Sequence, residues 1–258
     1  MGHAMVVAAV AIVALMLVMW VISVVITNAS IVDIVWGLGF VLVAWAVRLT
    51  TDQGDDARQW LLVAMTTAWG LRLAVHLFIR NHGHGEDYRY RAMRKHYGPR
   101  FGVISLYSVF GLQGLLMFVV SLPVQLGQAD PTPGLGVVAA VGVALWAIGM
   151  FFESVGDAQL ARFKANPDNA GGVMNQGLWR YTRHPNYFGD ACVWWGIGIV
   201  AAETGAGAWG LIGSAVMTFL LRRVSGVTML EKTIGRRRAG YDEYIRTTSP
   251  FIPRPPRA

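Results

Sequence analysis

Long apolar stretches alternate with short polar ones along the whole chain. Seven of the apolar stretches are long enough to cross roughly 30 Å of hydrocarbon as helices. They fall near residues 5–27, 30–49, 60–80, 106–127, 134–153, 185–202 and 206–221. Residues 5–27 stay apolar for too long to be the core of a cleaved signal peptide, so we expect them to form the first permanent span. The pattern predicts an all-α membrane helix bundle of about seven transmembrane helices.

Basic residues cluster in alternate connecting segments. Most of the 22 Lys and Arg residues lie in the 81–105 loop, the 154–184 loop and the tail from Arg222, whereas residues 50–59, 128–133 and 203–205 are acidic or neutral. Lys and Arg accumulate on the cytoplasmic side of membrane proteins. The alternation therefore requires an odd number of spans, and it predicts an N-terminus outside and a C-terminus in the cytoplasm.

The composition agrees with a membrane protein and excludes several other classes. Hydrophobic residues make up 54% of the chain and charged residues 14%, against about a quarter charged in soluble domains. The net charge of +7 does not indicate a nucleic-acid partner, because the basic residues flank apolar stretches. With the single Cys192 the chain has no internal disulfide and no cysteine metal cluster, and we predict no metal site. We expect one integral membrane domain over residues 1–258.

Ionisable side chains inside the predicted spans are candidates for function, because charge in hydrocarbon is costly. Asp33 lies a few residues into the second span, where it either caps a neighbouring helix or takes part in a reaction. Arg72 and His76 are four residues apart on one face of the third span. A carboxylate such as Asp33 would neutralise Arg72, and this structural pairing is the favoured interpretation.

The segment from Gly177 to Asp190 is the richest in polar residues. Pro185 suits the first turn of a helix, where its missing N–H has no partner to lose. Asn186 and Asp190, four residues apart, then project toward the same side. Free helix N–H groups together with Arg180 and Arg183 predict a phosphate-binding site. Interfacial anchoring would explain the arginine and aromatic residues but not Asn186 and Asp190.

The same segment carries a family resemblance. Arg183-His184-Pro185-Asn186-Tyr187-Phe188-Gly189-Asp190 resembles the signature of the steroid 5α-reductase C-terminal superfamily, most closely its bacterial branch, catalogued as domain of unknown function 1295. The resemblance covers most of the chain and is most specific over residues 150–255. Relatives include sterol C14 and Δ7 reductases and, more distantly, isoprenylcysteine carboxyl methyltransferases.

For this chain, the resemblance implies a seven-helix protein of the bacterial inner membrane with an active site open to the cytoplasm. Residues 1–105 would form the substrate side and residues 106–258 would bind NADPH. Asn186 and Asp190 match the asparagine and acid that hold the cofactor in the reductases, and Asp157, Leu160 and Lys164 match an acid, an apolar residue and a basic residue with the same role. Glu153 and Glu231 stand where the reductases have an asparagine and a histidine. The full predicted cofactor-binding set is Asp157, Leu160, Lys164, Arg180, Arg183, His184, Asn186, Tyr187, Asp190, Glu231 and Tyr241.

The implied chemistry is hydride transfer from NADPH to a carbonyl-conjugated C=C bond of a lipid or steroid-like substrate. The carbonyl oxygen gains negative charge, so a hydrogen-bond donor must point at it. The steroid enzymes use a glutamate on the second helix and a tyrosine on the third. Asp33 would replace the glutamate, and because the third span has no tyrosine, Trp69 is the nearest residue to the expected depth. Asp33 and Trp69 are therefore the predicted catalytic residues.

Two alternatives remain open. The first is an S-adenosylmethionine-dependent membrane methyltransferase of the isoprenylcysteine methyltransferase type, which shares a basic–His-Pro–Tyr element at a helix start. The second is a non-enzymatic transporter that uses Asp33, Arg72 and His76 as an intramembrane relay. The run from Asp157 to Lys164 favours the reductase, and the crowding of polar residues at one end of the spans argues against a transport path.

Overall fold

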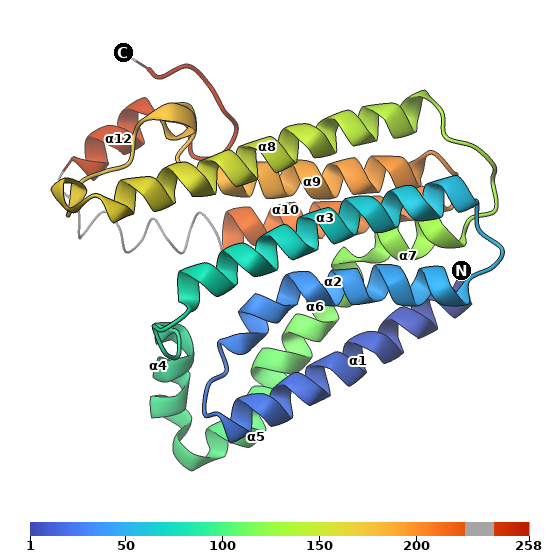
Figure 1. The fold of residues 1–258 in the computed structure, drawn as a ribbon, viewed down its shortest axis with the longest axis horizontal. Helices are drawn as coiled ribbons and strands as arrows, with labels where there is room; N and C mark the ends of the chain where they lie inside the picture. Colours follow the sequence, from blue (N-terminus) through green and yellow to red (C-terminus); the bar gives the residue numbers. More distant parts are fainter. Residues whose placement is uncertain (225–239, 258) are drawn as a thin grey trace. The chain divides into compact units, whose positions relative to one another are not determined.

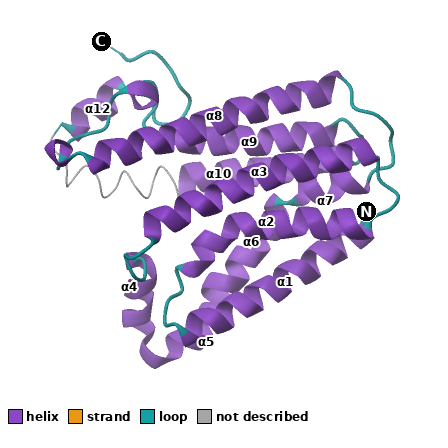
Figure 2. Cartoon of the chain, in the orientation of Figure 1, coloured by secondary structure: helices purple, strands orange, loops and turns teal. Residues whose placement is uncertain are grey.

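All secondary structure that the computed structural model describes is helical (Figures 1 and 2). The described residues are 1–224 and 240–257, and within them there is 79% helix and no strand. Five stretches of this part are long and apolar enough to cross a membrane: Gly2–Val25, Ile31–Thr50, Asp56–Asn81, Tyr88–Val120 and Val137–Ala165. The predicted all-α class is confirmed, and the apolar helices indicate an integral membrane protein.

The chain divides into two compact units. Unit 1 comprises residues 1–139 and 197–213, and unit 2 comprises residues 140–196 and 214–258. Within residues 1–136 of unit 1 the α-helices are α1 (Gly2–Val25), α2 (Ile31–Thr50), α3 (Asp56–Asn81), α4 (Tyr88–Tyr97), α5 (Phe101–Ser105), α6 (Leu112–Val120) and α7 (Leu122–Ala129). A 3₁₀-helix, η1 (Gly98–Arg100), joins α4 to α5, and a π-helix, η2 (Leu106–Gly111), joins α5 to α6.

The helix boundaries of unit 1 agree with the hydrophobic pattern in the first three spans and depart from it afterwards. The segment expected to be a loop, residues 81–105, contains α4 and α5. The expected span 106–127 is divided at Ser121, where α6 ends and α7 begins with Pro123 in its first turn. Proline has no N–H to donate to the preceding turn, so the chain starts a new helix there.

Close packing of α2 against α3 depends on two glycines. A Cβ on Gly37 would lie 2.7 Å from the carbonyl oxygen of Gly70, and a Cβ on Gly70 would lie 2.6 Å from the carbonyl oxygen of Gly37. The two backbones therefore touch, as small residues allow in membrane helix pairs. This contact fixes α2, and with it the position of Asp33.

Unit 2 is built on α8 (Val137–Ala165) and α9 (Pro185–Ala202), which enter it at Ala140 and leave it at Gly196. It also holds the later part of α10 (Leu211–Phe219), the π-helix η6 (Leu220–Val224) and α12 (Tyr241–Thr247). α9 begins at Pro185, as its sequence predicts. α8 continues twelve residues past the expected end of its span at residue 153, so the expected loop 154–184 begins as about three further helical turns.

Glycines also bring α8 and α9 into backbone contact. A Cβ on Gly149 would lie 2.5 Å from the carbonyl oxygen of Gly189, and a Cβ on Gly196 would lie 2.6 Å from that of Gly142. Glu153 and Asp157 follow Gly149 at four-residue intervals, so they remain on the side of α8 that faces α9. The two helices thus carry their polar residues into one shared seam.

Candidate functional site

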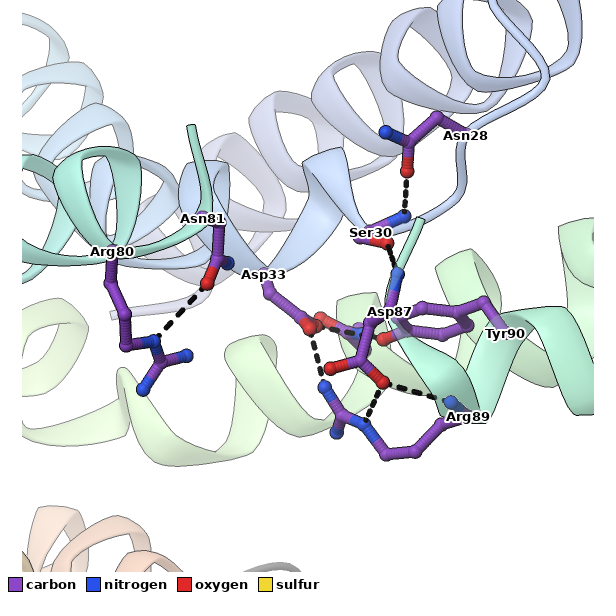
Figure 3. Close-up of polar contacts among 9 residues, drawn as sticks. Asn28, Ser30, Asp33, Arg80, Asn81, Asp87, Arg89 and Tyr90 are labelled. Atoms are coloured by element: carbon purple, nitrogen blue, oxygen red, sulfur yellow. Dashed lines mark hydrogen bonds and ion pairs between the residues drawn. The ribbon is translucent and has the colours of Figure 1, made fainter. Parts of the chain in front are cut away.

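Asp33, in the first turn of α2, is held by two donors from α4 (Figure 3). Arg89 Nη2 donates to Asp33 Oδ2 over 2.6 Å, and Tyr90 Oη donates to Asp33 Oδ1 over 2.7 Å. The Tyr90 side chain is buried, and its oxygen also accepts a 3.2 Å hydrogen bond from Gln113 Nε2 of α6. Unit 1 therefore contains a carboxylate, a phenol and a guanidinium in direct contact.

The turns before α2 and α4 lock this arrangement in place. The Asp87 N–H donates to Ser30 Oγ over 2.6 Å, and the Ala29 N–H donates to Glu86 Oε1 over 2.8 Å. The Asp87 carboxylate accepts from the N–H and Nε of Arg89 and so caps α4. Because both turns bond to each other, α4 has one orientation against the start of α2.

The two acids of this turn stay ionised to low pH. Burial by itself would raise the pKa of Glu86, but the hydrogen bonds from Arg94 and from the Ala29 N–H outweigh it and hold the pKa below its ordinary value. Burial likewise opposes the charge on Asp87, and the side-chain and backbone donors of Arg89 lower the pKa of Asp87 in spite of it. Both acids are thus fixed negative partners for the arginines of α4.

Tyr90 is the residue that sequence reasoning missed. The resemblance places a tyrosine on the third span, whereas the tyrosine that bonds to Asp33 lies on α4, within the expected 81–105 loop. Trp69, the residue predicted for the tyrosine's role, is fully buried, and its ring lies 5.5 Å from that of Phe40. The sequence paired Asp33 with Arg72, whereas in the structure Arg89 donates to Asp33. One signal in the sequence could have identified Tyr90. Tyr90, Met93 and Arg94 are spaced so that they share one side of a helix, which predicts that this charged segment is helical and buries that side.

In unit 2 the structure brings Asp157 and Asn186 together. Asn186 Nδ2 donates to Asp157 Oδ1 over 3.0 Å, across the glycine seam of α8 and α9. Asp190 is buried one turn beyond Asn186, and Glu153 is buried one turn before Asp157. His184 stacks on Tyr187 at the start of α9, with ring centroids 5.5 Å apart. Carboxylate and amide groups in this seam suit hydroxyl and amide ligands.

The two arginines predicted to bind phosphate have different surroundings. Arg183 is buried, and its guanidinium donates to the carbonyl oxygens of Ile245 and Thr248 over 3.0 and 2.5 Å. It therefore fastens the end of α12. Arg180 is exposed and lines a pocket of about 720 Å³ together with residues of α12, including Glu243 and Tyr244.

The N-terminus of α9 offers fewer free donors than expected. The Tyr187 N–H donates to the Asn186 side-chain oxygen over 3.1 Å, and the Phe188 N–H donates to the His184 carbonyl over 3.0 Å. Of the groups predicted to form one phosphate site, Arg180 in its pocket is therefore better suited to an anion than the start of α9.

The remaining predicted residues occupy varied positions. Leu160 is half-buried and Lys164 exposed, both further along α8 from Asp157. Tyr241 is buried in α12, with its ring 5.9 Å from that of Tyr244. Glu231 lies outside the described residues.

Comparison with known families identifies the group to which the chain belongs. The model of a family of proteins of unknown function, DUF1295, matches residues 19–248. The chain is a member of this family, which is related to steroid 5α-reductase-like proteins. The comparisons of this chain with curated proteins and with solved structures found no match.

Proposed function

We propose that this DUF1295 protein is an NADPH-dependent membrane reductase that acts on a carbonyl-conjugated C=C bond of a lipophilic substrate. The observation that carries the proposal is the buried hydroxyl of Tyr90, held between the carboxylate of Asp33 and the amide of Gln113. A phenol in such a position is the donor that an enone reduction needs. Tyr90 takes the role that the sequence had suggested for Trp69.

Each residue of the Asp33 site has a task in this chemistry. When hydride adds to the β-carbon of an enone, the carbonyl oxygen becomes an enolate oxygen, and a preorganised donor stabilises it. Tyr90 Oη is that donor: its single O–H, which bonds to Asp33 in the structure, would turn from Asp33 to the carbonyl oxygen when the substrate binds, while Asp33 keeps its bond to Arg89. Asp33 orients the phenol, and Arg89 keeps the charge of Asp33 balanced at the edge of the hydrocarbon.

The residues of unit 2 fit a nicotinamide dinucleotide. When bound, NADPH supplies the hydride. The buried Asp157 and Asp190 and the half-buried Asn186 would bind ribose hydroxyl or carboxamide groups, since carboxylates and amides pair with such donors and acceptors. Arg180 would bind phosphate in its pocket, whose volume of about 720 Å³ lies in the range of cofactor sites.

The proposal of a lipophilic substrate is supported by an apolar groove in unit 1. It has a volume of about 250 Å³ and lies between α1 and the segment from η2 to α6, lined by residues such as Ile12, Met16, Phe110 and Gly114. The exposed neighbours of these residues on α1, among them Val13 and Leu17, are apolar, so the groove continues the lipid-facing surface. Gln113, which bonds Tyr90, directly precedes Gly114 on α6.

The proposal includes the topology inferred from charge. α9 and the segment from α10 to η6 add two spans to the five apolar stretches, with the N-terminus outside and the active site open to the cytoplasm. Labelling of single cysteines introduced at the exposed positions Gln53 and His84, in a Cys192→Ser background, tests the topology. A membrane-impermeant thiol reagent added to intact cells is expected to modify the first and not the second.

The function is tested first by binding. Calorimetry on the detergent-purified protein is expected to show NADPH binding that Asn186→Ala weakens and Tyr90→Phe leaves unchanged. Turnover of lipid enones is then expected to fall roughly 10²- to 10³-fold in Tyr90→Phe, the usual effect of removing one oxyanion donor. Tyr107→Phe, an exposed position on η2, is the matched control.

Two other results would redirect the assignment. Binding of S-adenosylmethionine in place of NADPH would indicate the methyltransferase. Absence of binding of either cofactor, combined with solute flux that depends on Asp33, would indicate the transporter.

A further inference from the structure

α4 has two faces of different character. The residues that lie against the rest of unit 1 are Arg89, Tyr90, Met93 and Arg94. The residues on the other side are all exposed: Tyr88, Arg91, Ala92, Lys95 and His96. These positions recur at three- and four-residue spacing, so each set occupies one side of the helix. We name the second set, together with the exposed Arg100 of η1, the outer face of α4.

Ion pairing concentrates positive charge on the outer face. The acids between Arg80 and Arg100 are Glu86 and Asp87, and both bond to arginines of the covered face: Glu86 to Arg94 over 2.8 Å and Asp87 to Arg89 over 2.9 Å. Arg89 is also the partner of Asp33. Both acids of this turn form their ion pairs with arginines of the covered face. The outer face therefore presents the positive charges of Arg91, Lys95 and Arg100 to its surroundings.

The geometry of α4 suits the membrane surface. The candidate membrane-spanning stretch that begins with α4 runs for 33 residues, about a dozen more than a span requires. Gly98, with φ of +56°, and Pro99 separate α4 from the helices that follow. Figure 1 draws α4 turned steeply away from the long helices of unit 1. The ten residues of α4 would extend only about 15 Å, too short to cross the hydrocarbon.

An exposed tyrosine belongs to the outer face, and two others follow it along the chain. Tyr88 of this face is 58% exposed, and Tyr97 and Tyr107 are exposed as well. Exposed tyrosine beside arginine and lysine is the composition of a helix at the level of lipid head groups.

We propose that the outer face of α4 binds anionic phospholipids of the bilayer, with Arg91, Lys95 and Arg100 contacting their phosphates. The complementary charge and the position beside the lipid-facing surface identify the occupant as a lipid head group. Arg89 and Tyr90, on the opposite face of the same helix, bond to Asp33. Lipid bound to the outer face of α4 therefore stabilises the orientation of α4 in which these two bonds form. This proposal concerns unit 1 alone and does not depend on NADPH or on turnover.

The test compares the full-length protein in nanodiscs of phosphatidylcholine with and without phosphatidylglycerol. Hydrogen exchange of the α4 amides is expected to slow in the presence of phosphatidylglycerol. In the triple variant Arg91→Gln, Lys95→Gln, Arg100→Gln the slowing is expected to disappear. Native mass spectrometry in detergent is expected to show phosphatidylglycerol binding weakened on the order of a hundredfold in that variant, since each surface cation contributes about fivefold. All three side chains are exposed, and near-UV circular dichroism checks that the variant folds.

A second triple variant serves as control. Arg162→Gln, Arg254→Gln, Arg257→Gln removes the same charge from exposed positions of unit 2 and is expected to respond like the wild type. Equal loss in both variants, or a response that survives in the α4 variant, would overturn the proposal. Slowing by inorganic phosphate in phosphatidylcholine nanodiscs, as strong as that by phosphatidylglycerol, would overturn the lipid as the occupant.

Discussion

The hydrogen bond between Tyr90 and Asp33 makes a quantitative prediction about coupling. Its 2.7 Å length and its carboxyl acceptor, which also pairs with Arg89, place it among bonds worth about 1.5–3 kcal/mol. Bonds between side chains of membrane helices average about 0.6 kcal/mol and reach about 1.7. Tyr90 is buried and Asp33 is 19% exposed in its side chain, so we expect a value near the upper end, about 1–2 kcal/mol.

A double-mutant cycle measures this energy. The variants are Tyr90→Phe, Asp33→Ala and the combination of both. Loss of the Arg89 ion pair accompanies Asp33→Ala in either background, so it cancels from the cycle. Unfolding in mixed micelles with increasing dodecyl sulfate, followed by circular dichroism, gives the free energy of each variant.

The expected result is that Tyr90→Phe costs about 1–2 kcal/mol with Asp33 present and much less once Asp33 is alanine. If the two single costs add within about 0.3 kcal/mol, the two side chains are not coupled and the proposed donor pair does not exist. Tyr107→Phe, at a side chain that is 69% exposed, is expected to change stability by less than about 0.5 kcal/mol.

Three further predictions follow from other contacts. Gly70→Ala is expected to destabilise the protein by about 1–3 kcal/mol in the same assay, because its Cβ would lie 2.6 Å from the Gly37 carbonyl; Gly102→Ala, with one atom at 3.9 Å, is the control. Arg183→Met is expected to speed hydrogen exchange in α12 at least about tenfold, because the carbonyls of Ile245 and Thr248 lose their donor, whereas the exposed Arg246→Met is expected to have no such effect. Because the pKa values of Glu86 and Asp87 are lowered in the folded protein, their contribution to α4 docking is present above the unfolded values near pH 4 and is lost as the pH falls through the folded ones. Exchange in α4 measured against pH would contradict this if α4 loosened between pH 7 and 5.

The features that sequence predicts well are those set by local rules. The extents of α1, α2 and α3 follow from the length of apolar runs, and the start of α9 follows from Pro185. The bond between Asp157 and Asn186 joins two residues that the resemblance had assigned to one site. Hydropathy marks where hydrocarbon ends and not where a helix ends, so it missed the continuation of α8 to Ala165.

The features that sequence could not supply are contacts between distant residues. Asp33 and Tyr90 are 57 positions apart, and their meeting depends on a turn whose own bonds come from Ala29 and Ser30. Arg183 shows the same limit, since an arginine before a helix suits a phosphate as well as it suits the carbonyls of α12. The residues next to Arg183 in the sequence are compatible with either partner. Only the tertiary structure shows that the guanidinium binds the carbonyls of α12.

The π-helix from Leu106 to Gly111 has a consequence for comparing this chain with its relatives. A π-turn holds one residue more than the α-helix around it, so it amounts to an insertion within a continuous helix. Winding the same residues as an uninterrupted α-helix would instead rotate everything that follows by about 100°. Gln113 would turn away from Tyr90, and Gly114 would no longer lie opposite Met16. An alignment of this family should therefore allow a one-residue gap at this point, and a relative without the extra residue should carry its tyrosine-binding amide at a shifted position.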